Sequence, residues 1–174
     1  MAKIILVTGA CRSGKSAFAQ TKAAAFGEKA VFVATAEAID GEMAERIAKH
    51  KQNRNPNWEV LEAPVEIGLA VGSALTHVPI VIVDCITIWV ANLMHYSSVF
   101  NEEKAASVAE ELVKTLSQVE GSVIFVTNEV GWGIVPADPQ TRLYRDCAGR
   151  INQIIANAAD EVYMCVCGIA QKIK

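Results

Sequence analysis

The sequence lacks the features of a membrane protein and of a nucleic-acid-binding protein. None of its apolar runs reaches the ~18 uninterrupted residues of a membrane span. Its start, MAKIILVTGACRSGKS, turns polar after a short apolar run and does not fit a signal peptide. The formal net charge is −3, so no general basic surplus attracts nucleic acid. The sequence therefore predicts a cytoplasmic protein with no stable membrane insertion and no nucleic-acid partner.

Cysteine pairs with the C-x-x-C spacing of zinc sites are also missing. The five cysteines are odd in number, and three of them lie in apolar, strand-like runs. Reduced thiols are the expectation for such a pattern. Cys165 and Cys167, one residue apart, leave a metal or redox role open beside a simpler interpretation as small apolar residues of a strand.

Short runs rich in Val and Ile are present instead, and they alternate with longer helical patterns. With 52% hydrophobic and 20% charged residues, the chain suits one packed domain, residues 1–174. The predicted strands span 3–8, 30–36, 79–85, 121–127 and 160–167, with a weaker one at 58–63. The predicted helices span 14–26, 41–54, 64–75, 101–118 and 139–158. Asp40 is expected to cap the second helix. This alternation predicts a three-layer α/β fold with a mostly parallel central sheet.

The stretch GACRSGKS follows the first predicted strand and precedes the first predicted helix. It matches the phosphate-binding pattern G-x-x-x-x-G-K-[ST] in the required strand–loop–helix context. Gly9 and Gly14 permit backbone torsions that turn successive N–H groups toward phosphate oxygens. Lys15 supplies a positive charge to the outer phosphates, and Ser16 offers a hydroxyl to Mg²⁺. The pattern predicts a nucleotide site on a P-loop NTPase fold.

Polar residues near the ends of other predicted strands are candidates for the same site. Asp84 ends PIVIVD, where a buried carboxylate is costly without a nearby cation, and it is expected to hold the Mg²⁺ shell or to cap the following segment. Glu62 and Glu129 are each either ligand-contacting or solvated loop carboxylates. Thr35 closes a strand and could face the ligand crevice. The loop 128–140 follows a strand and should be ordered, at the edge where open α/β sheets bind ligands.

One basic cluster needs a local explanation on this acidic chain. In ERIAKHKQNR, a helix would place Arg46, His50 and Arg54 along one side, because they recur every four residues. Stacked cations require an anion, and the Arg neighbours would disfavour protonation of the imidazole. A neutral imidazole beside guanidinium groups is suited to attack phosphorus while the Arg groups stabilise the oxyanion. The pattern alone leaves a solvated helix face equally open.

Several segments carry a family resemblance over nearly the whole chain. They are ILVTGACRSGKS, EMAERIAKHKQNR followed by W, DCIT, TNEVGWGIVP, and RDCAGRINQIIANAADEV with the closing GIAQKIK. Together they resemble the bifunctional adenosylcobinamide kinase/adenosylcobinamide-phosphate guanylyltransferase family of cobalamin biosynthesis. The resemblance implies that ATP or GTP phosphorylates adenosylcobinamide. GMP from GTP then passes through a guanylyl-histidine to the new phosphate, which gives adenosylcobinamide-GDP and pyrophosphate.

The resemblance also assigns residues. It places the guanylylated histidine at His50. The P-loop pattern itself gives Lys15 a catalytic role and predicts Mg²⁺ at Ser16 and Asp84. The nucleotide contacts that the resemblance implies are Gly9, Ala10, Cys11, Arg12, Ser13, Gly14, Lys15, Ser16, Ala34, Thr35, Ala36, Lys51, Gln52, Asn53, Arg54, Glu62 and Asp84. Relatives have a RecA-like fold and form homotrimers. For His50 to reach a triphosphate on the P-loop, its helix must lean over that loop, so we expect the helix to be mobile without nucleotide.

Two positions depart from the family pattern. Some relatives have Glu where this chain has Asp84, and either carboxylate can serve Mg²⁺ through water. Some have a second histidine where this chain has Lys49, which leaves His50 as the single candidate nucleophile. Two rival functions are a P-loop small-molecule kinase without covalent histidine chemistry and a nucleotide-binding regulatory protein. Against a GTPase-type regulator, TNEVG stands where an N-K-x-D guanine-reading motif would be expected.

Overall fold

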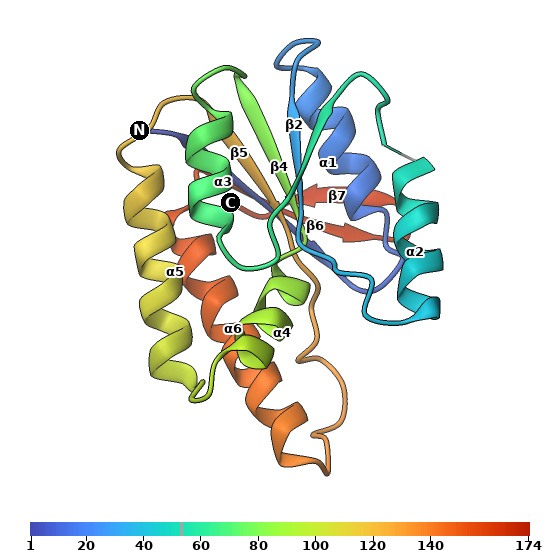
Figure 1. The fold of residues 1–174 in the computed structure, drawn as a ribbon, viewed down its shortest axis with the longest axis vertical. Helices are drawn as coiled ribbons and strands as arrows, with labels where there is room; N and C mark the ends of the chain where they lie inside the picture. The colour runs from blue at the N-terminus through green and yellow to red at the C-terminus, as the bar shows by residue number, and fades with distance from the viewer. Residues whose placement is uncertain (53) are drawn as a thin grey trace.

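A computed structural model of the protein describes residues 1–52 and 54–174, with the side chain of Arg46 also left out. Within this part of the chain, seven strands form one sheet in the order β3-β2-β4-β5-β1-β6-β7 (Figure 1). Their bounds are β1 Lys3–Gly9, β2 Val31–Ala34, β3 Glu59–Glu62, β4 Ile80–Asp84, β5 Ser122–Val126, β6 Glu161–Val166 and β7 Ile169–Lys172. All neighbouring strands pair in parallel except β6 and β7. The predicted α/β fold with a mostly parallel sheet is confirmed.

Six helices of the described chain connect the strands. They are α1 Lys15–Ala24, α2 Gly41–Gln52, α3 Ile67–Ala74, α4 Ile86–Tyr96, α5 Glu102–Leu116 and α6 Pro139–Ala158. The cap predicted for α2 is confirmed, because the Asp40 carboxylate accepts the Met43 N–H at 2.7 Å. None of the helices in the described chain is long and apolar enough to cross a membrane.

Helices cover the two faces of the sheet. On one face α1 packs through Ala19 and Ala23, which are fully buried. On the other face α3, α5 and α6 pack side by side, and Val71, Leu112 and Ile151 reach the sheet from them (Figure 1). The inner strand β4 is buried on both faces, which explains its uninterrupted apolar run.

Two elements were not predicted from the sequence. The helix α4 is apolar along most of its length, and its residues Ile86, Thr87, Trp89 and Val90 are buried. It therefore lacks the clear polar face by which an amphipathic helix is recognised in a sequence. The strand β7 is short and mostly exposed, so no apolar alternation marks it. A tight turn at Cys167 and Gly168, both with positive φ, returns the chain onto β6. Both elements depend on tertiary packing more than on local pattern.

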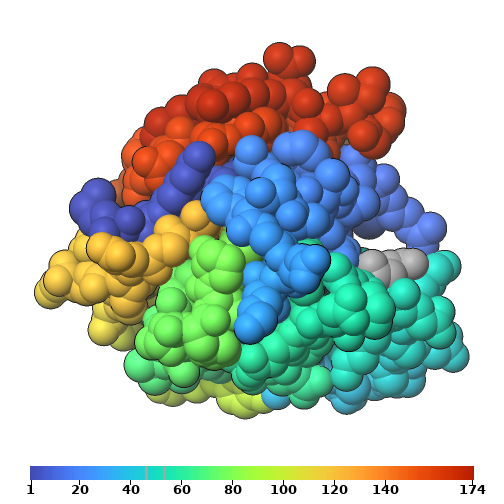
Figure 2. Space-filling model, turned by 90° about the horizontal axis from the view of Figure 1, so that it is seen from above, coloured from blue at the N-terminus to red at the C-terminus, as the bar shows by residue number. Residues whose placement is uncertain are grey.

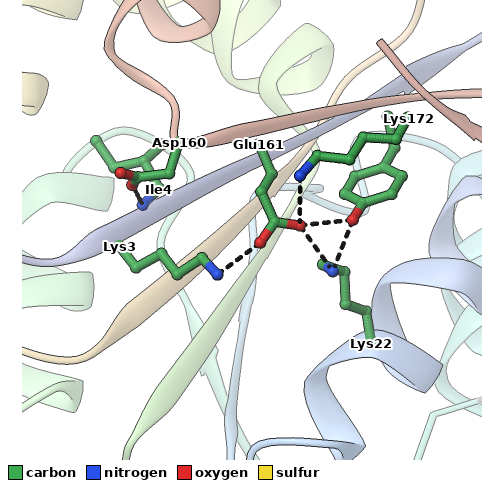
Figure 3. Close-up of polar contacts among 7 residues, drawn as sticks. Lys3, Ile4, Lys22, Asp160, Glu161 and Lys172 are labelled. Carbon is green, nitrogen blue, oxygen red and sulfur yellow. Dashed lines mark hydrogen bonds and ion pairs between the residues drawn. The ribbon is translucent and has the colours of Figure 1, made fainter. Parts of the chain in front are cut away.

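A group of charged side chains joins β6 to its neighbours, and Figure 3 shows its centre at Glu161. The Lys3 ammonium of β1 lies 2.5 Å from the carboxylate, the Lys22 ammonium of α1 lies 3.0 Å away, and the Lys172 ammonium of β7 lies 4.0 Å away. The Tyr163 hydroxyl donates to the same carboxylate at 2.5 Å. Hydrogen bonds from Lys3, Tyr163 and Lys22, in that order, lower the pKa of Glu161 to about 2. The carboxylate thus links the P-loop strand, the P-loop helix and the C-terminal hairpin.

We expect Glu161→Gln to lower the free energy of unfolding at pH 7 by about 1–2 kcal/mol, a value reduced for solvent screening of the exposed lysines. Because the folded-state pKa lies below the ordinary value of 4.5, the contribution is complete above pH 4.5 and is lost as the pH falls toward 2. Urea unfolding of both proteins at pH 7 and at pH 3 measures it. Glu110→Gln on the exposed face of α5 is the control. An equal loss in both variants, or a Glu161 effect independent of pH, would contradict this assignment.

Candidate functional site

The P-loop lies between β1 and α1, at the carboxyl edge of the sheet (Figure 1). Its two pattern glycines have positive φ, 144° at Gly9 and 96° at Gly14, and Arg12 between them has φ 57°. A Cβ atom at Gly9 would lie 2.3 Å from the Cys165 carbonyl oxygen, so no other residue fits there without movement. The expectation that the glycines are required by backbone torsion is therefore confirmed at both positions.

The turn of the β6–β7 hairpin packs against the P-loop. The Gly168 N–H donates to the Ser13 carbonyl at 3.0 Å. A Cβ atom at Gly14 would approach the Gly168 Cα to 3.0 Å, so the turn packs directly on the loop. This support was missed from the sequence, although the Cys167–Gly168 pair before IAQK is a turn signal. The hairpin helps to hold the loop in the conformation that a phosphate would meet.

Lys15 is 7% exposed, which is unusual for a lysine. Its ammonium donates to the Ala10 carbonyl at 2.6 Å and to the Ser13 hydroxyl at 3.4 Å. Burial lowers the pKa of Lys15, and attraction to Asp84 opposes the shift. The P-loop thus holds a desolvated cation against its own carbonyl, with a carboxylate across the site.

Asp84 ends β4 and is half-buried. The alternative role as a helix cap is wrong, because Cys85 occupies the N-cap of α4 and makes no side-chain cap hydrogen bond. In the described residues, no group of three or more His, Cys, Asp or Glu side chains could hold a metal. A single carboxylate at this strand end, near the P-loop lysine, nevertheless fits Mg²⁺, which usually takes few protein ligands and completes its shell with phosphate oxygens and water.

The end of β2 lies between two acidic strand ends. Ala34 pairs in register with Glu62 of β3 and with Asp84 of β4. Thr35 follows, and its side chain is fully buried. Its hydroxyl accepts the Cys85 N–H at 2.8 Å and donates to the Cys85 carbonyl at 2.9 Å. The expectation that Thr35 faces the crevice is therefore wrong, because the residue is fully buried and its backbone carbonyl accepts from the Asn92 side chain at 2.8 Å.

Arg54 does not continue the helical row that the sequence suggested. The helix α2 ends at Gln52, and Arg54 folds inward so that its guanidinium lies 4.1 Å from the centre of the Phe32 ring. The Nε and Nη1 atoms are buried without a hydrogen-bond partner among the described residues. Burial lowers the pKa of Arg54, while attraction to Asp84 and Glu62 opposes the shift. The ring and the two carboxylates explain why this side chain leaves the helix surface.

A cavity of about 600 Å³ opens beside Arg54. Its lining includes Lys51, Gln52, Arg54, Trp58, Val60 and Glu62. The Lys51 ammonium lies 3.1 Å from the Glu62 carboxylate, but both side chains are more than half exposed, so the pair is weak and open to exchange with an anion. Trp58, which the sequence analysis did not single out, is buried, and its indole N–H has no described partner.

His50 lies in the last turn of α2, next to Lys51, and is exposed. It makes no hydrogen bond or ion pair with any described residue. Figure 2 shows an opening between the blue N-terminal segment and the cyan segment that contains α2. The side chain of Arg46 and all of Asn53 lie outside the described structure. The structure thus brings Lys15, Asp84, Arg54 and Glu62 to one edge, and leaves His50 accessible at the neighbouring helix end.

The loop after β5 is ordered, as predicted. Arg145 donates to the carbonyls of Ile134 and Gly131, both at 3.0 Å. Arg142 donates to the Pro136 and Ala137 carbonyls at 2.9 and 2.7 Å. Two side chains of α6 therefore replace the backbone pairing that an irregular loop lacks.

Glu129, at the start of this loop, is half-buried rather than solvated. Its carboxylate accepts the Thr8 hydroxyl at 2.6 Å, and its N–H donates to the Gly9 carbonyl at 3.2 Å. The loop is thereby attached to the first residue of the P-loop. Of the two interpretations left open for Glu129, a freely solvated loop carboxylate is excluded.

Comparison with known proteins gives consistent similarities along the chain. A family model described as Cobinamide kinase / cobinamide phosphate guanyltransferase matches residues 5–173. A bifunctional adenosylcobalamin biosynthesis protein CobP from Pseudomonas aeruginosa is 36% identical over 169 residues, covering 97% of this chain and 96% of the relative. Bifunctional adenosylcobalamin biosynthesis proteins CobU from Escherichia coli and Salmonella typhimurium are 35% and 37% identical over 183 residues, each covering 98% of this chain and 99% of the relative.

Proposed function

We propose, because the chain belongs to the Cobinamide kinase / cobinamide phosphate guanyltransferase family, that it catalyses two consecutive reactions. In the first, a nucleoside triphosphate phosphorylates adenosylcobinamide. In the second, GTP donates GMP to the adenosylcobinamide phosphate, and pyrophosphate leaves. The observation that carries this proposal is the buried Lys15 ammonium inside a glycine-shaped loop, because such a cation serves a triphosphate in both reactions.

The P-loop supports the phosphate-binding part of the proposal. Backbone N–H groups of residues 9–16 surround the phosphates, and Lys15 exchanges the Ala10 carbonyl for a phosphate oxygen. Arg54 supports the same role, because its two unpartnered buried nitrogens need an acceptor that a phosphate can provide. The nucleotide contacts expected from the family resemblance are part of this proposal. Either ATP or GTP serves as the phosphoryl donor in this proposal.

A nucleophilic His50 accounts for the second reaction. Its imidazole nitrogen attacks the α-phosphorus of GTP, an N–P bond forms, and the bond to pyrophosphate breaks. A phosphate oxygen of adenosylcobinamide phosphate then attacks the same phosphorus and releases His50. The exposed imidazole next to Lys51 supports this role, because nothing in the described structure has to be displaced from it. The proposal requires α2 to lean toward the P-loop when nucleotide binds.

Ser16 and Asp84 would hold Mg²⁺, because Ser16 follows Lys15 in the P-loop and the Asp84 carboxylate attracts the Lys15 ammonium. When bound there, Mg²⁺ neutralises charge on the phosphates. The chain's own residues position the triphosphate through the P-loop backbone and Lys15. Asp84 also faces the cations Lys15 and Arg54, which balances their charge before nucleotide arrives.

The acceptor and the assembly complete the proposal. The loop 128–140 exposes Trp132, Ile134 and Val135 at 73%, 96% and 67%, next to the P-loop attachment at Glu129. Such a surface suits a large, partly apolar substrate, so we place the corrinoid acceptor there. Residues 1–174 act as one catalytic domain, and the assembly expected from the family resemblance is a homotrimer.

A two-stage assay tests the function. The protein is incubated with adenosylcobinamide, ATP and Mg²⁺, and then with GTP, while mass spectrometry follows the corrinoid. We expect adenosylcobinamide phosphate in the first stage, and adenosylcobinamide-GDP with pyrophosphate in the second. A product that stops at the phosphate would leave the kinase alone. No corrinoid product in either stage would favour the nucleotide-binding regulator.

A further inference from the structure

The phosphorylation of an alcohol needs a group that accepts the hydroxyl proton, and neither Lys15 nor Asp84 is suited to that role. Lys15 is a cation, and Asp84 is assigned to Mg²⁺. Kinases commonly use a carboxylate near the transferred phosphoryl group for this purpose. The inference that follows rests on the proposed function, because it concerns the acceptor hydroxyl of the kinase reaction.

Glu129 is the carboxylate that is attached to the P-loop itself. The preceding strand β5 lies between β1, which leads into the P-loop, and β4, which ends at Asp84. The Glu129 N–H donates to the Gly9 carbonyl, so the residue begins where the phosphate loop begins. The Thr8 hydroxyl donates to Oε1 at 2.6 Å and holds the side chain at this edge. Oε2 has no hydrogen-bond or ion-pair partner among the described residues, so one oxygen stays available to a substrate.

The other carboxylates at this edge have different surroundings. Glu62 forms an ion pair with Lys51 at 3.1 Å. Asp84 attracts both Lys15 and Arg54. Glu37 is half-buried on the loop after β2, and its carboxylate accepts the hydroxyl of the exposed Tyr96 at 2.9 Å. Glu129 differs from Glu62 and Asp84 because its described partner is a neutral hydroxyl, and it differs from Glu37 because that hydroxyl belongs to Thr8, next to the P-loop.

The segment that follows Glu129 leads toward the surface where the acceptor is placed. The side chains of Trp132, Ile134 and Val135 are exposed on the same loop. Arg145 donates hydrogen bonds to the carbonyls of Gly131 and Ile134. These bonds fix the position of the apolar residues relative to Glu129. An acceptor resting on the loop would present its hydroxyl near Glu129 and the outer phosphate together.

We propose that Glu129 is a catalytic residue of the kinase reaction and accepts the proton of the acceptor hydroxyl. The O–H bond of the alcohol breaks, and its proton passes to Oε2 of Glu129. The alcohol oxygen forms a bond to the γ-phosphorus, and the bond from that phosphorus to the β-phosphate oxygen breaks with its electron pair on the nucleoside diphosphate. Glu129 then releases the proton to solvent, so the reaction yields a phosphate ester, a nucleoside diphosphate and one proton.

The second reaction of the same enzyme provides an internal control. Its acceptor is a phosphate monoester, which is already largely ionised at neutral pH because its second pKa is about 6. Guanylyl transfer to that phosphate therefore needs no proton acceptor at Glu129. A defect confined to the first reaction separates a proton-transfer role from a general loss of structure.

The test measures both reactions in Glu129→Gln, which keeps the Thr8 contact possible but cannot take a proton. We expect the kinase kcat to fall by roughly 10²–10⁴-fold. GMP transfer to supplied adenosylcobinamide phosphate should stay at the wild-type rate. The wild-type kinase rate should also decline on the acid side of its pH profile, and this decline should be absent from the residual activity of the variant.

Glu66→Gln is the matched control, because Glu66 is an exposed carboxylate that precedes α3 and makes no cap hydrogen bond. It should leave both reactions unchanged. An equal loss of both reactions in Glu129→Gln would assign Glu129 to loop structure and overturn the proposal, as would an unchanged kinase rate. If the wild-type protein performs neither reaction, the proposed function itself is wrong. This outcome is distinguished from a failure of the Glu129 proposal because it is seen without any substitution.

Discussion

Replacing Lys15 with alanine is expected to abolish phosphorylation and guanylylation together. The Lys15 ammonium is the buried positive charge of the P-loop, held 2.6 Å from the Ala10 carbonyl. A triphosphate tail bound to the loop needs this charge whether its γ-phosphoryl group is transferred or its pyrophosphate departs. Removing one preorganised charge of this kind costs at least roughly 10²–10³-fold in rate. The kinase rate and the covalent labelling from GTP, measured on the same preparation, show whether both reactions are lost.

The control for this variant is Lys29→Ala, since Lys29 is exposed in the connection between α1 and β2. It should match the wild type in both reactions. Thermal unfolding of Lys15→Ala should show an intact fold, because alanine removes a desolvated cation and leaves the glycine-shaped backbone in place. Normal guanylylation with lost kinase activity would mean that GTP uses a site separate from the P-loop.

Replacing His50 with alanine is expected to remove the covalent intermediate and leave the kinase reaction intact. After incubation with α-labelled GTP and Mg²⁺ and then denaturation, the wild type should retain label that is acid-labile and base-stable. In His50→Ala this label should fall to background. GMP transfer should fall by roughly 10⁴-fold or more, as for other enzymes that lose their nucleophile. Phosphorylation of adenosylcobinamide does not use the imidazole and should continue at the wild-type rate.

His77→Ala is the matched control for this experiment. His77 is also exposed, but it lies 3.1 Å from Glu59 and has no place near the P-loop edge. The variant should keep the label. Label that persists in His50→Ala would assign the nucleophile elsewhere, with the neighbouring Lys49 and Lys51 amines as the first alternatives. No label on the wild type, together with normal kinase activity, would leave a kinase without covalent histidine chemistry.

The parts of the fold that repeat a local pattern were predictable from the sequence. Six of the seven strands and five of the six helices of the described chain lie within a few residues of their predicted ranges. Buried parallel strands require continuous Val and Ile, and the P-loop requires glycine at fixed spacing, so both leave a local signal. The helix α4 and the strand β7 leave no such signal, because one is apolar along most of its length and the other is short and exposed.

The candidate site divides in the same way. Gly9, Gly14 and Lys15 could be identified from spacing alone, because their roles depend on the backbone of one loop. The inward position of Arg54 could not, since it depends on the Phe32 ring and on two carboxylates from other strands. The burial of Thr35 likewise depends on Cys85, fifty positions away in the chain.

By itself the sequence determined the nature of the protein: a parallel α/β sheet, a phosphate loop with its lysine, and a histidine in a basic segment. These depend on residue type and spacing over a few positions. Only the tertiary structure decided which groups meet. It placed the C-terminal hairpin behind the P-loop, turned Arg54 away from the helix row of His50, and joined Glu129 to Gly9. The physical reason is that these contacts connect strands whose order in the sheet differs from their order in the chain.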